Sequence, residues 1–253
     1  MPLRRSSYQR NKSPAHSVKS ASAKYGRDSA QACVAQNNYA IYCKEIGQFD
    51  RAEKIYRRLL QVYRSAEQSL NRAIVYHNLG GLEHARGRFA RGEPWARKAV
   101  KIRTRLLGSS HPSVAADEVA LGAILDGRGK HREAQRLYRH ALRIFRAAKR
   151  PDAYEIAVTL NNLAASCHAI GARTAAARFY QQALDLKEKL LGRKHIDLAV
   201  TLNNMALLFE SQKKHELART YLKRALAILQ SVLPSSHPKL AICRKNYAKL
   251  ARE

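Results

Sequence analysis

The sequence predicts an all-α solenoid of about five helix pairs, closed by a C-terminal capping helix. Three observations predict this fold. A short motif returns at an almost constant spacing, small residues return at fixed offsets from that motif, and the composition favours helices. Hydrophobic residues make up 45% of the 253 residues, while only 12 glycines and 7 prolines interrupt the chain. Because a repeat of this length cannot bury its core alone, neighbouring repeats must stabilise one another.

The repeated motif contains a marker asparagine followed by apolar and small residues. The segments QNNYAIY, YHNLGGL, TLNNLAAS, TLNNMALL and KNYAKL carry the motif. The first step between markers is 40 residues and each later step is 42, with Ala120 in the place of the third marker. The marker asparagines are Asn38, Asn78, Asn162, Asn204 and Asn246. The repeats are therefore expected at about 29–68, 69–110, 111–152, 153–194 and 195–236, with the cap at 237–253.

Fixed offsets from the marker predict a helix A, a short turn and a helix B in every repeat. A glycine nine residues after the marker ends helix A in four repeats, and Lys213 replaces it in the fifth. Small residues further on let helices approach closely, and tyrosines fill the space between them. In the cap, Ile242, Tyr247 and Leu250 are expected to cover the fifth repeat. The glycines are Gly47, Gly87, Gly129 and Gly171, the small residues are Ala52, Gly92, Ala134, Ala176 and Ala218, and the tyrosines are Tyr56, Tyr138 and Tyr180.

Residues 1–28 are expected to form a disordered basic N-terminal arm. This stretch is basic and rich in serine, and it holds no acidic residue before Asp28. Pro14 and the scarcity of apolar residues argue against an amphipathic helix there. An organelle transit peptide is the alternative, because such segments are also basic and serine-rich. The cytoplasm is otherwise the expected location.

The net charge of the chain is extreme for its size. Lysine and arginine number 47 against 19 acidic residues, which gives a formal charge of +28 and a pI near 10.5. Such a charge predicts attraction to acidic protein surfaces, to nucleic acid or to anionic membrane, and it does not choose among them. No stretch approaches the ~20 consecutive apolar residues that a membrane-spanning helix needs.

The motifs of enzymes and metal sites are missing from the sequence. It lacks the phosphate loop GxxxxGK[ST], the zinc motif HExxH and the nucleophile motif GxSxG. His111, His195 and His237 recur in the loops between repeats, where each is expected to cap the helix that follows. No catalytic residue, no metal and no cofactor is therefore expected. The four cysteines have no metal-ligand spacing and are expected to be buried, reduced thiols: Cys33, Cys43, Cys167 and Cys243.

The whole pattern resembles a known repeat family. The series of marker asparagine, glycine, small residue and tyrosine resembles the tetratricopeptide repeat. Its 42-residue form, with TLNNLA and with LLGSSHP at 106–112, is similar to the repeats of the kinesin light chain family. The resemblance covers about residues 31–253. It implies a right-handed α-solenoid in which the A helices line a concave groove and the B helices face outward.

The resemblance also implies a non-catalytic scaffold that binds an extended, often acidic, segment of a partner protein in this groove. Asparagine suits such a groove, because its amide can pair with both the N–H and the C=O of a peptide backbone. The alternative is that one asparagine of each pair only ties helix A to its neighbour. The expected groove residues are Asn37, Asn38, His77, Asn78, Asn161, Asn162, Asn203, Asn204, Lys245 and Asn246.

Basic residues concentrate on helix B rather than on the groove positions of helix A. Several of them recur at spacings of three and four, which predicts basic stripes on an outer face. These stripes are an ordinary solvated surface, a site that attaches the protein to nucleic acid or anionic membrane, or a surface for acidic protein partners. Attachment to nucleic acid or anionic membrane is the alternative function. The predicted basic outer face comprises Arg97, Lys101, Arg105, Arg136, Arg139, Arg143 and Arg146.

Overall fold

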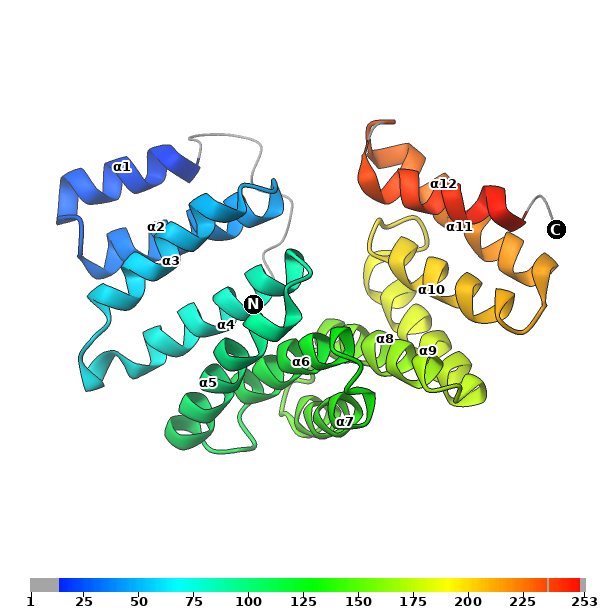
Figure 1. Ribbon diagram of the computed structural model, residues 1–253, viewed down its shortest axis with the longest axis horizontal. Helices are drawn as coiled ribbons and strands as arrows, with labels where there is room; N and C mark the ends of the chain where they lie inside the picture. Colours follow the sequence, from blue (N-terminus) through cyan, green and yellow to red (C-terminus); the bar gives the residue numbers. More distant parts are fainter. Residues whose placement is uncertain (1–13, 236, 251–253) are drawn as a thin grey trace. The chain divides into compact units, whose positions relative to one another are not determined.

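The computed structural model describes residues 14–235 and 237–250, and all regular structure in these two ranges is helical. The predicted all-α class is confirmed. The chain divides into two compact units, which meet in sequence between Ser109 and Ser110 and are described separately (Figure 1). The N-terminal unit holds α1 (Pro14–Tyr25), α2 (Ala30–Glu45), α3 (Phe49–Val62), a short 3₁₀ helix (Ala66–Gln68), α4 (Ser69–Ala85) and α5 (Phe89–Leu107). The C-terminal unit holds α6 (Pro112–Gly127), α7 (His131–Ala147), α8 (Ala153–Ala169), α9 (Arg173–Leu191), α10 (Leu198–Glu210), α11 (His215–Val232) and α12 (Pro238–Leu250).

Consecutive helices pack as A and B partners within each unit. The A helices α2 and α4 pack on the B helices α3 and α5, and the same pairing joins α6 with α7, α8 with α9 and α10 with α11. The final helix α12 packs on α11. Short turns favour this arrangement, because two helices joined by a few residues become antiparallel neighbours.

The prediction of disorder is wrong for residues 14–25, which form α1 against α2. Pro14 occupies the first helical position, where proline is tolerated because its missing N–H would have no partner there. Ala15, Val18 and Ser22 are half-buried at spacings of three and four, so a narrow stripe of small side chains is enough to pack. The remainder of the predicted arm that precedes Pro14 lies outside the described residues.

The A-to-B turns adopt the left-handed backbone that the glycine pattern predicts. Gly47, Gly87, Gly129 and Gly171 have φ between 70° and 80°. Lys213, the non-glycine member of this series, adopts φ 59° and is the only described non-glycine residue with positive φ. The fifth repeat therefore keeps the left-handed turn although lysine replaces glycine there.

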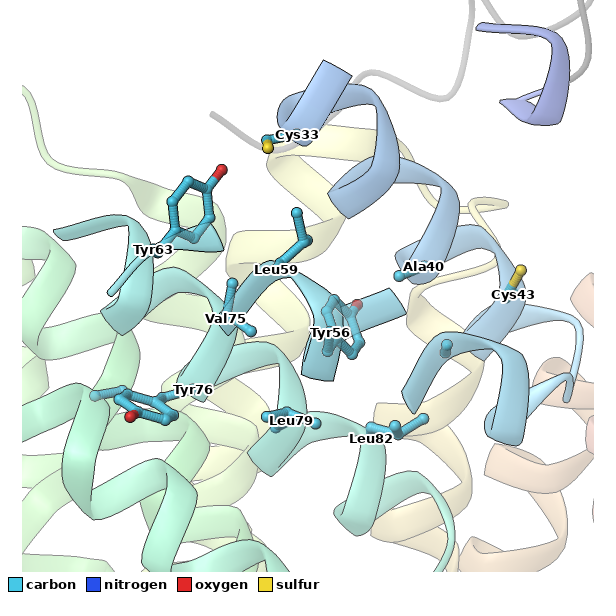
Figure 2. Packing of buried hydrophobic residues seen from close by; sticks show 12 residues of the cluster. Cys33, Ala40, Cys43, Tyr56, Leu59, Tyr63, Val75, Tyr76, Leu79 and Leu82 are labelled. Atoms are coloured by element: carbon cyan, nitrogen blue, oxygen red, sulfur yellow. The ribbon is translucent and has the colours of Figure 1, made fainter. Parts of the chain in front are cut away.

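The core repeats the same contacts along the chain. The small residues Ala52, Ala134, Ala176 and Ala218 are fully buried, as expected from close helix approach. In the N-terminal unit, Tyr56 of α3 lies among Ala40 of α2 and Leu79 and Leu82 of α4 (Figure 2). The four cysteines are buried free thiols.

One of the loop histidines, His111, caps the helix that follows as predicted. His111 Nδ1 accepts the Ser113 N–H at 3.1 Å at the start of α6, and His195 Nδ1 accepts the Asp197 N–H at 3.2 Å before α10. The His111 bond satisfies an N–H group in the first turn of α6, which has no partner inside the helix. The His195 bond lies before the first residue of α10, so the prediction that His195 caps this helix is wrong. The cap helix α12 buries Leu240, Cys243 and Leu250, whereas Ile242 is 59% exposed. The expectation that Ile242 covers the fifth repeat is therefore wrong.

Two buried tyrosines in equivalent positions differ in their hydrogen bonds, and this difference predicts opposite effects of removing the hydroxyl. Tyr138 donates to Asp126 Oδ2 at 2.9 Å, whereas the buried Tyr56 hydroxyl has no partner among the described residues. We expect Tyr138→Phe to lower the free energy of unfolding by about 1.5–3 kcal/mol, since a bond to a charged acceptor is lost. We expect Tyr56→Phe to leave it unchanged or to raise it. Urea unfolding followed by circular dichroism measures both, and equal losses would contradict the assignment.

Candidate protein-binding face of the A helices

The marker asparagines lie on the A helices of both units, and most stay at the surface. Asn38 is exposed, and Asn78, Asn162, Asn204 and Asn246 are half-buried. The residue just before each marker varies more in its solvent exposure. Lys245 is exposed, and Asn37, His77 and Asn203 are half-buried. Asn161 is buried, and its Oδ1 atom has no hydrogen-bond partner in the described chain. We call Asn38, Asn78, Asn162, Asn204 and Asn246 the amide row.

Two members of the amide row bond to the preceding repeat. Asn78 Nδ2 donates to Asn37 Oδ1 at 2.7 Å, which links α4 to α2. Asn246 Nδ2 donates to Asn203 Oδ1 at 2.9 Å, which links α12 to α10. Each bond joins the marker asparagine of one repeat to the asparagine just before the marker in the preceding repeat. The framework role therefore applies to these two residues.

The other three members of the amide row make no side-chain hydrogen bond in the part of the chain described here. For Asn162, the equivalent of the accepting asparagine is Val119, which has no polar group to offer and is buried. For Asn204, the equivalent is Asn161, and no bond joins the two side chains. Asn38 belongs to the first repeat. These three amides are available to an external partner, although binding itself stays a prediction.

In each unit, apolar residues at one offset lie beside the marker asparagines, and the sequence analysis missed them. Four of the six are exposed, whereas Ala116 and Val158 are half-buried. All six stand four residues before the marker position, so that each lies one helical turn from it on the same face of helix A. Val34 and Ile242 are each 59% exposed, Val200 is 46% exposed and Ile74 is 41% exposed. The signal was present in the sequence, because five of the six residues at this offset are valine or isoleucine. We call Val34, Ile74, Ala116, Val158, Val200 and Ile242 the apolar row.

The apolar row borders a pocket in the C-terminal unit. The pocket has a volume of about 170 Å³ and lies among α10, α11 and α12. Val200, Asn203 and Ile242 line it together with Ile196, Ala199, Leu229 and Cys243. The lining is predominantly apolar, and the amide of Asn203 supplies its side-chain polar group. Such a combination suits one apolar side chain of a ligand whose backbone lies next to the amide.

The charges close to this face are partly neutralised. Lys249 Nζ bonds Glu210 Oε1 at 2.6 Å, so the carboxylate six residues beyond Asn204 in α10 is paired. Burial and the nearby charge of Arg173 lower the pKa of His168, which is therefore neutral at pH 7. His168 Nε2 lies 3.3 Å from Ser211 Oγ. The face thus offers amides, apolar side chains and a neutral imidazole rather than an acid–base pair.

The predicted basic outer face is solvent-exposed in both units. Arg97, Lys101 and Arg105 are exposed on α5, and Arg136, Arg139, Arg143 and Arg146 are exposed on α7. Within the described ranges, no group of three or more histidine, cysteine or acidic residues is placed to hold a metal ion. No helix of the described chain is long and apolar enough to cross a membrane.

Comparisons with solved structures identify the fold. A protein titled BtubC (BKLC) from P. vanneervenii superposes with a TM-score of 0.62 at 23% identity, over 87% of this chain and 84% of that one. A putative kinesin light chain with nearly identical repeats from Podospora anserina gives a TM-score of 0.63 at 20% identity, over 78% and 94%. The apo form of RapI gives 0.65 at 15% identity, over 87% and 83%. At these identities the likeness establishes the solenoid fold alone.

Sequence comparison identifies the family. No curated protein matches the chain by sequence. Family models described as tetratricopeptide repeat match residues 71–147 and 155–231, and a further one matches residues 40–69. The first model alone covers more than half of the chain. The chain therefore belongs to the tetratricopeptide repeat family.

Proposed function

We propose that this protein is a non-catalytic scaffold that binds an extended segment of a partner protein on the A-helix face. The observation that carries the proposal is the pairing of two rows on that face. One row offers amides without internal partners at Asn38, Asn162 and Asn204. The other offers apolar side chains one turn away, which are exposed at Val34 and Val200 and half-buried at Val158. Proteins of this family and fold are generally scaffolds rather than catalysts. The cytoplasm is the proposed location, because the four buried free thiols suit a reducing compartment.

The two rows would recognise different parts of the partner. A free asparagine amide can accept from a backbone N–H and donate to a backbone C=O, so the amide row would hold a main chain of any sequence. The apolar row would select side chains. Val200 and Ile242 flank the pocket of about 170 Å³, which would take one apolar side chain as an anchor.

Helix spacing sets the expected spacing of those side chains. Packed helices lie roughly 8–10 Å apart, which an extended chain spans in about three residues at ~3.3 Å each. The C-terminal unit carries Val158, Val200 and Ile242 on successive A helices. We therefore expect its partner segments to carry apolar side chains about three residues apart. Acidic residues between them would be favoured by the long-range attraction of a chain with net charge +28.

Selection from a phage-displayed library of random peptides provides defined ligands, and two matched substitutions test where they bind. Val200→Asp places a like charge against an acidic peptide and removes an apolar contact from the pocket rim. We expect it to weaken the selected peptides by more than about tenfold in fluorescence anisotropy. Asn204→Ala, at a side chain without an internal hydrogen bond, should weaken them by a smaller factor.

Val232→Asp is the matched control, because Val232 is also a valine of the C-terminal unit, is 55% exposed, and lies at the end of the B helix α11. Its affinity should stay within about twofold of the unchanged protein. Equal losses for Val200→Asp and Val232→Asp, with circular dichroism unchanged in both, would rule out the A-helix face as the binding site.

A further inference from the structure

Five arginines form a single row along the B helix α7. They are separated by steps of four, three, four and three residues, which places them on one face of the helix. All five are exposed. From Arg132 to Arg146 the helix advances by 14 residue steps, or about 21 Å at ~1.5 Å per step. We call Arg132, Arg136, Arg139, Arg143 and Arg146 the α7 arginine stripe.

Carboxylates do not neutralise this stripe. Within the described chain, its one side-chain hydrogen bond joins Arg139 to the neutral Gln135, at 3.3 Å. The only acidic residue of α7 is Glu133. Glu118 of α6 attracts Arg143, but His140 Nδ1 binds its Oε2 at 2.7 Å. Because like charges three and four residues apart destabilise a helix, the stripe does not exist to stabilise α7.

Several other arginines of the described chain are paired with acids. Arg86 binds three carboxylates, Arg58 binds Asp28, and Arg224 binds Glu188. On α5, the other helix of the predicted basic outer face, Arg97 binds Glu93 at 2.8 Å. The α7 arginine stripe differs from these paired arginines, because within the described chain none of its five members binds a carboxylate.

The chemistry of the stripe favours phosphates over other anions. Each guanidinium can donate two parallel hydrogen bonds to one phosphate, and every member of the stripe is arginine rather than lysine. Insertion into a membrane surface needs large apolar side chains beside the charges, and the only other exposed residue of α7 is Ala147. The stripe also has no aromatic side chain on which an unpaired base could stack. These features suit a duplex, whose phosphates are displayed in regular rows while its bases are enclosed.

We propose that the α7 arginine stripe binds the phosphate backbone of a nucleic-acid duplex without reading its sequence. A length of about 21 Å matches about six base pairs at ~3.4 Å per pair. The site lies on a B helix, so it is separate from the A-helix face of the proposed scaffold function. A partner protein and a duplex would then be held by different helices of the C-terminal unit.

The salt dependence of binding tests this proposal. Fluorescently labelled DNA and RNA duplexes, each in two unrelated sequences, are titrated with the full chain at increasing salt. The logarithm of the binding constant falls as the logarithm of the salt concentration rises. The triple variant Arg136→Gln/Arg139→Gln/Arg143→Gln should make this fall less steep, reducing the magnitude of the slope by about 2.7, because each lost phosphate contact removes about 0.9. The loss should be the same for both sequences, and the comparison of DNA with RNA shows which duplex is preferred.

The control removes the same charge from other B helices of the C-terminal unit. Arg178→Gln/Lys189→Gln/Lys223→Gln changes three exposed residues of α9 and α11 and should lower the slope by less than about one. Equal reductions in the two triple variants would overturn the proposal in favour of a diffuse field. It would also be overturned if vesicles of anionic lipid or poly-glutamate competed as well as unlabelled duplex at equal charge.

Discussion

Replacing Arg86 with methionine is expected to lower the free energy of unfolding of the N-terminal unit by about 3–5 kcal/mol. The Arg86 side chain is only 5% exposed and binds Asp50 at 2.5 Å, Glu53 at 2.5 Å and Glu83 at 2.8 Å. Glu83 is itself 3% exposed, so its carboxylate would stay buried without this partner. Arg86 follows α4, whereas Asp50 and Glu53 belong to α3. The substitution therefore removes the ionic link between successive repeats. Urea unfolding followed by circular dichroism measures the change.

A second arginine on the same carboxylate provides the control. Arg57 binds Glu53 at 2.8 Å, but its side chain is 57% exposed. We expect Arg57→Met to cost less than about 1 kcal/mol, as exposed ion pairs do. If Arg86→Met and Arg57→Met lower the free energy of unfolding equally, burial is not the reason that the Arg86 ion pairs stabilise the protein.

The Arg86 cluster also predicts how stability depends on acid. Hydrogen bonding to Arg86 holds the pKa of Glu53 below its usual value of 4.5, despite the opposing effect of burial. A depressed carboxyl pKa contributes stability above the unfolded-state pKa, and that contribution is lost as the pH falls through the folded-state value. The loss therefore lies below about pH 4.5. Arg86→Met should flatten this part of the curve of stability against pH.

Changing Gly122 to alanine is expected to cost about 1–3 kcal/mol, because the new methyl group would overlap a buried ring. A Cβ atom at Gly122 would lie 2.6 Å from Cε1 and 2.8 Å from Cζ of Tyr138. That ring cannot move aside easily, since Tyr138 is fully buried and its hydroxyl is bound to Asp126. The loss would appear in unfolding of the C-terminal unit.

Gly81→Ala in α4 is the matched control. No atom lies within 4 Å of a Cβ added at Gly81, and its backbone is helical. The substitution should raise the free energy of unfolding by up to ~1 kcal/mol, because alanine is the better helix former. A stabilising effect of Gly122→Ala as well would show that the Tyr138 ring is free to shift.

These two glycines show where sequence reasoning stops. The position of Gly122 holds alanine in other repeats, at Ala40, Ala164 and Ala206, so a consensus argument would recommend alanine there. The close approach of the Tyr138 ring is a property of three-dimensional packing in one repeat. No pattern of residue types carries it.

The fold was predictable because one period controls helices, turns and core together. The marker asparagines, the turn glycines and the small residues all recur with the same period, so they predict the same helices and turns. Lys213, at the turn position that holds glycine in the other repeats, also adopts the left-handed backbone. Helix α1 was missed because its packing stripe consists of small residues such as Ala15 and Ser22, which carry little hydrophobic signal.

The candidate site was predictable only in outline. The sequence placed asparagines on helix A, but the division into bonded and free amides depends on which residue the neighbouring repeat presents. Asn78 donates a hydrogen bond to Asn37 of the preceding repeat. For Asn162, the equivalent position of the preceding repeat holds Val119, which cannot accept one. The apolar row was readable in the sequence at a fixed offset, yet its exposure required the structure, because Val and Ile are more often buried.

Hydrogen–deuterium exchange of the chain with a selected peptide tests the central claim most directly. The account predicts that bound peptide slows exchange in α10 and α12, around Val200, Asn203 and Ile242, and leaves the B helix α11 beyond Leu229 unchanged. Protection confined to the B helices, or a tight peptide that protects neither α10 nor α12, would contradict a scaffold that binds its partner on the A-helix face.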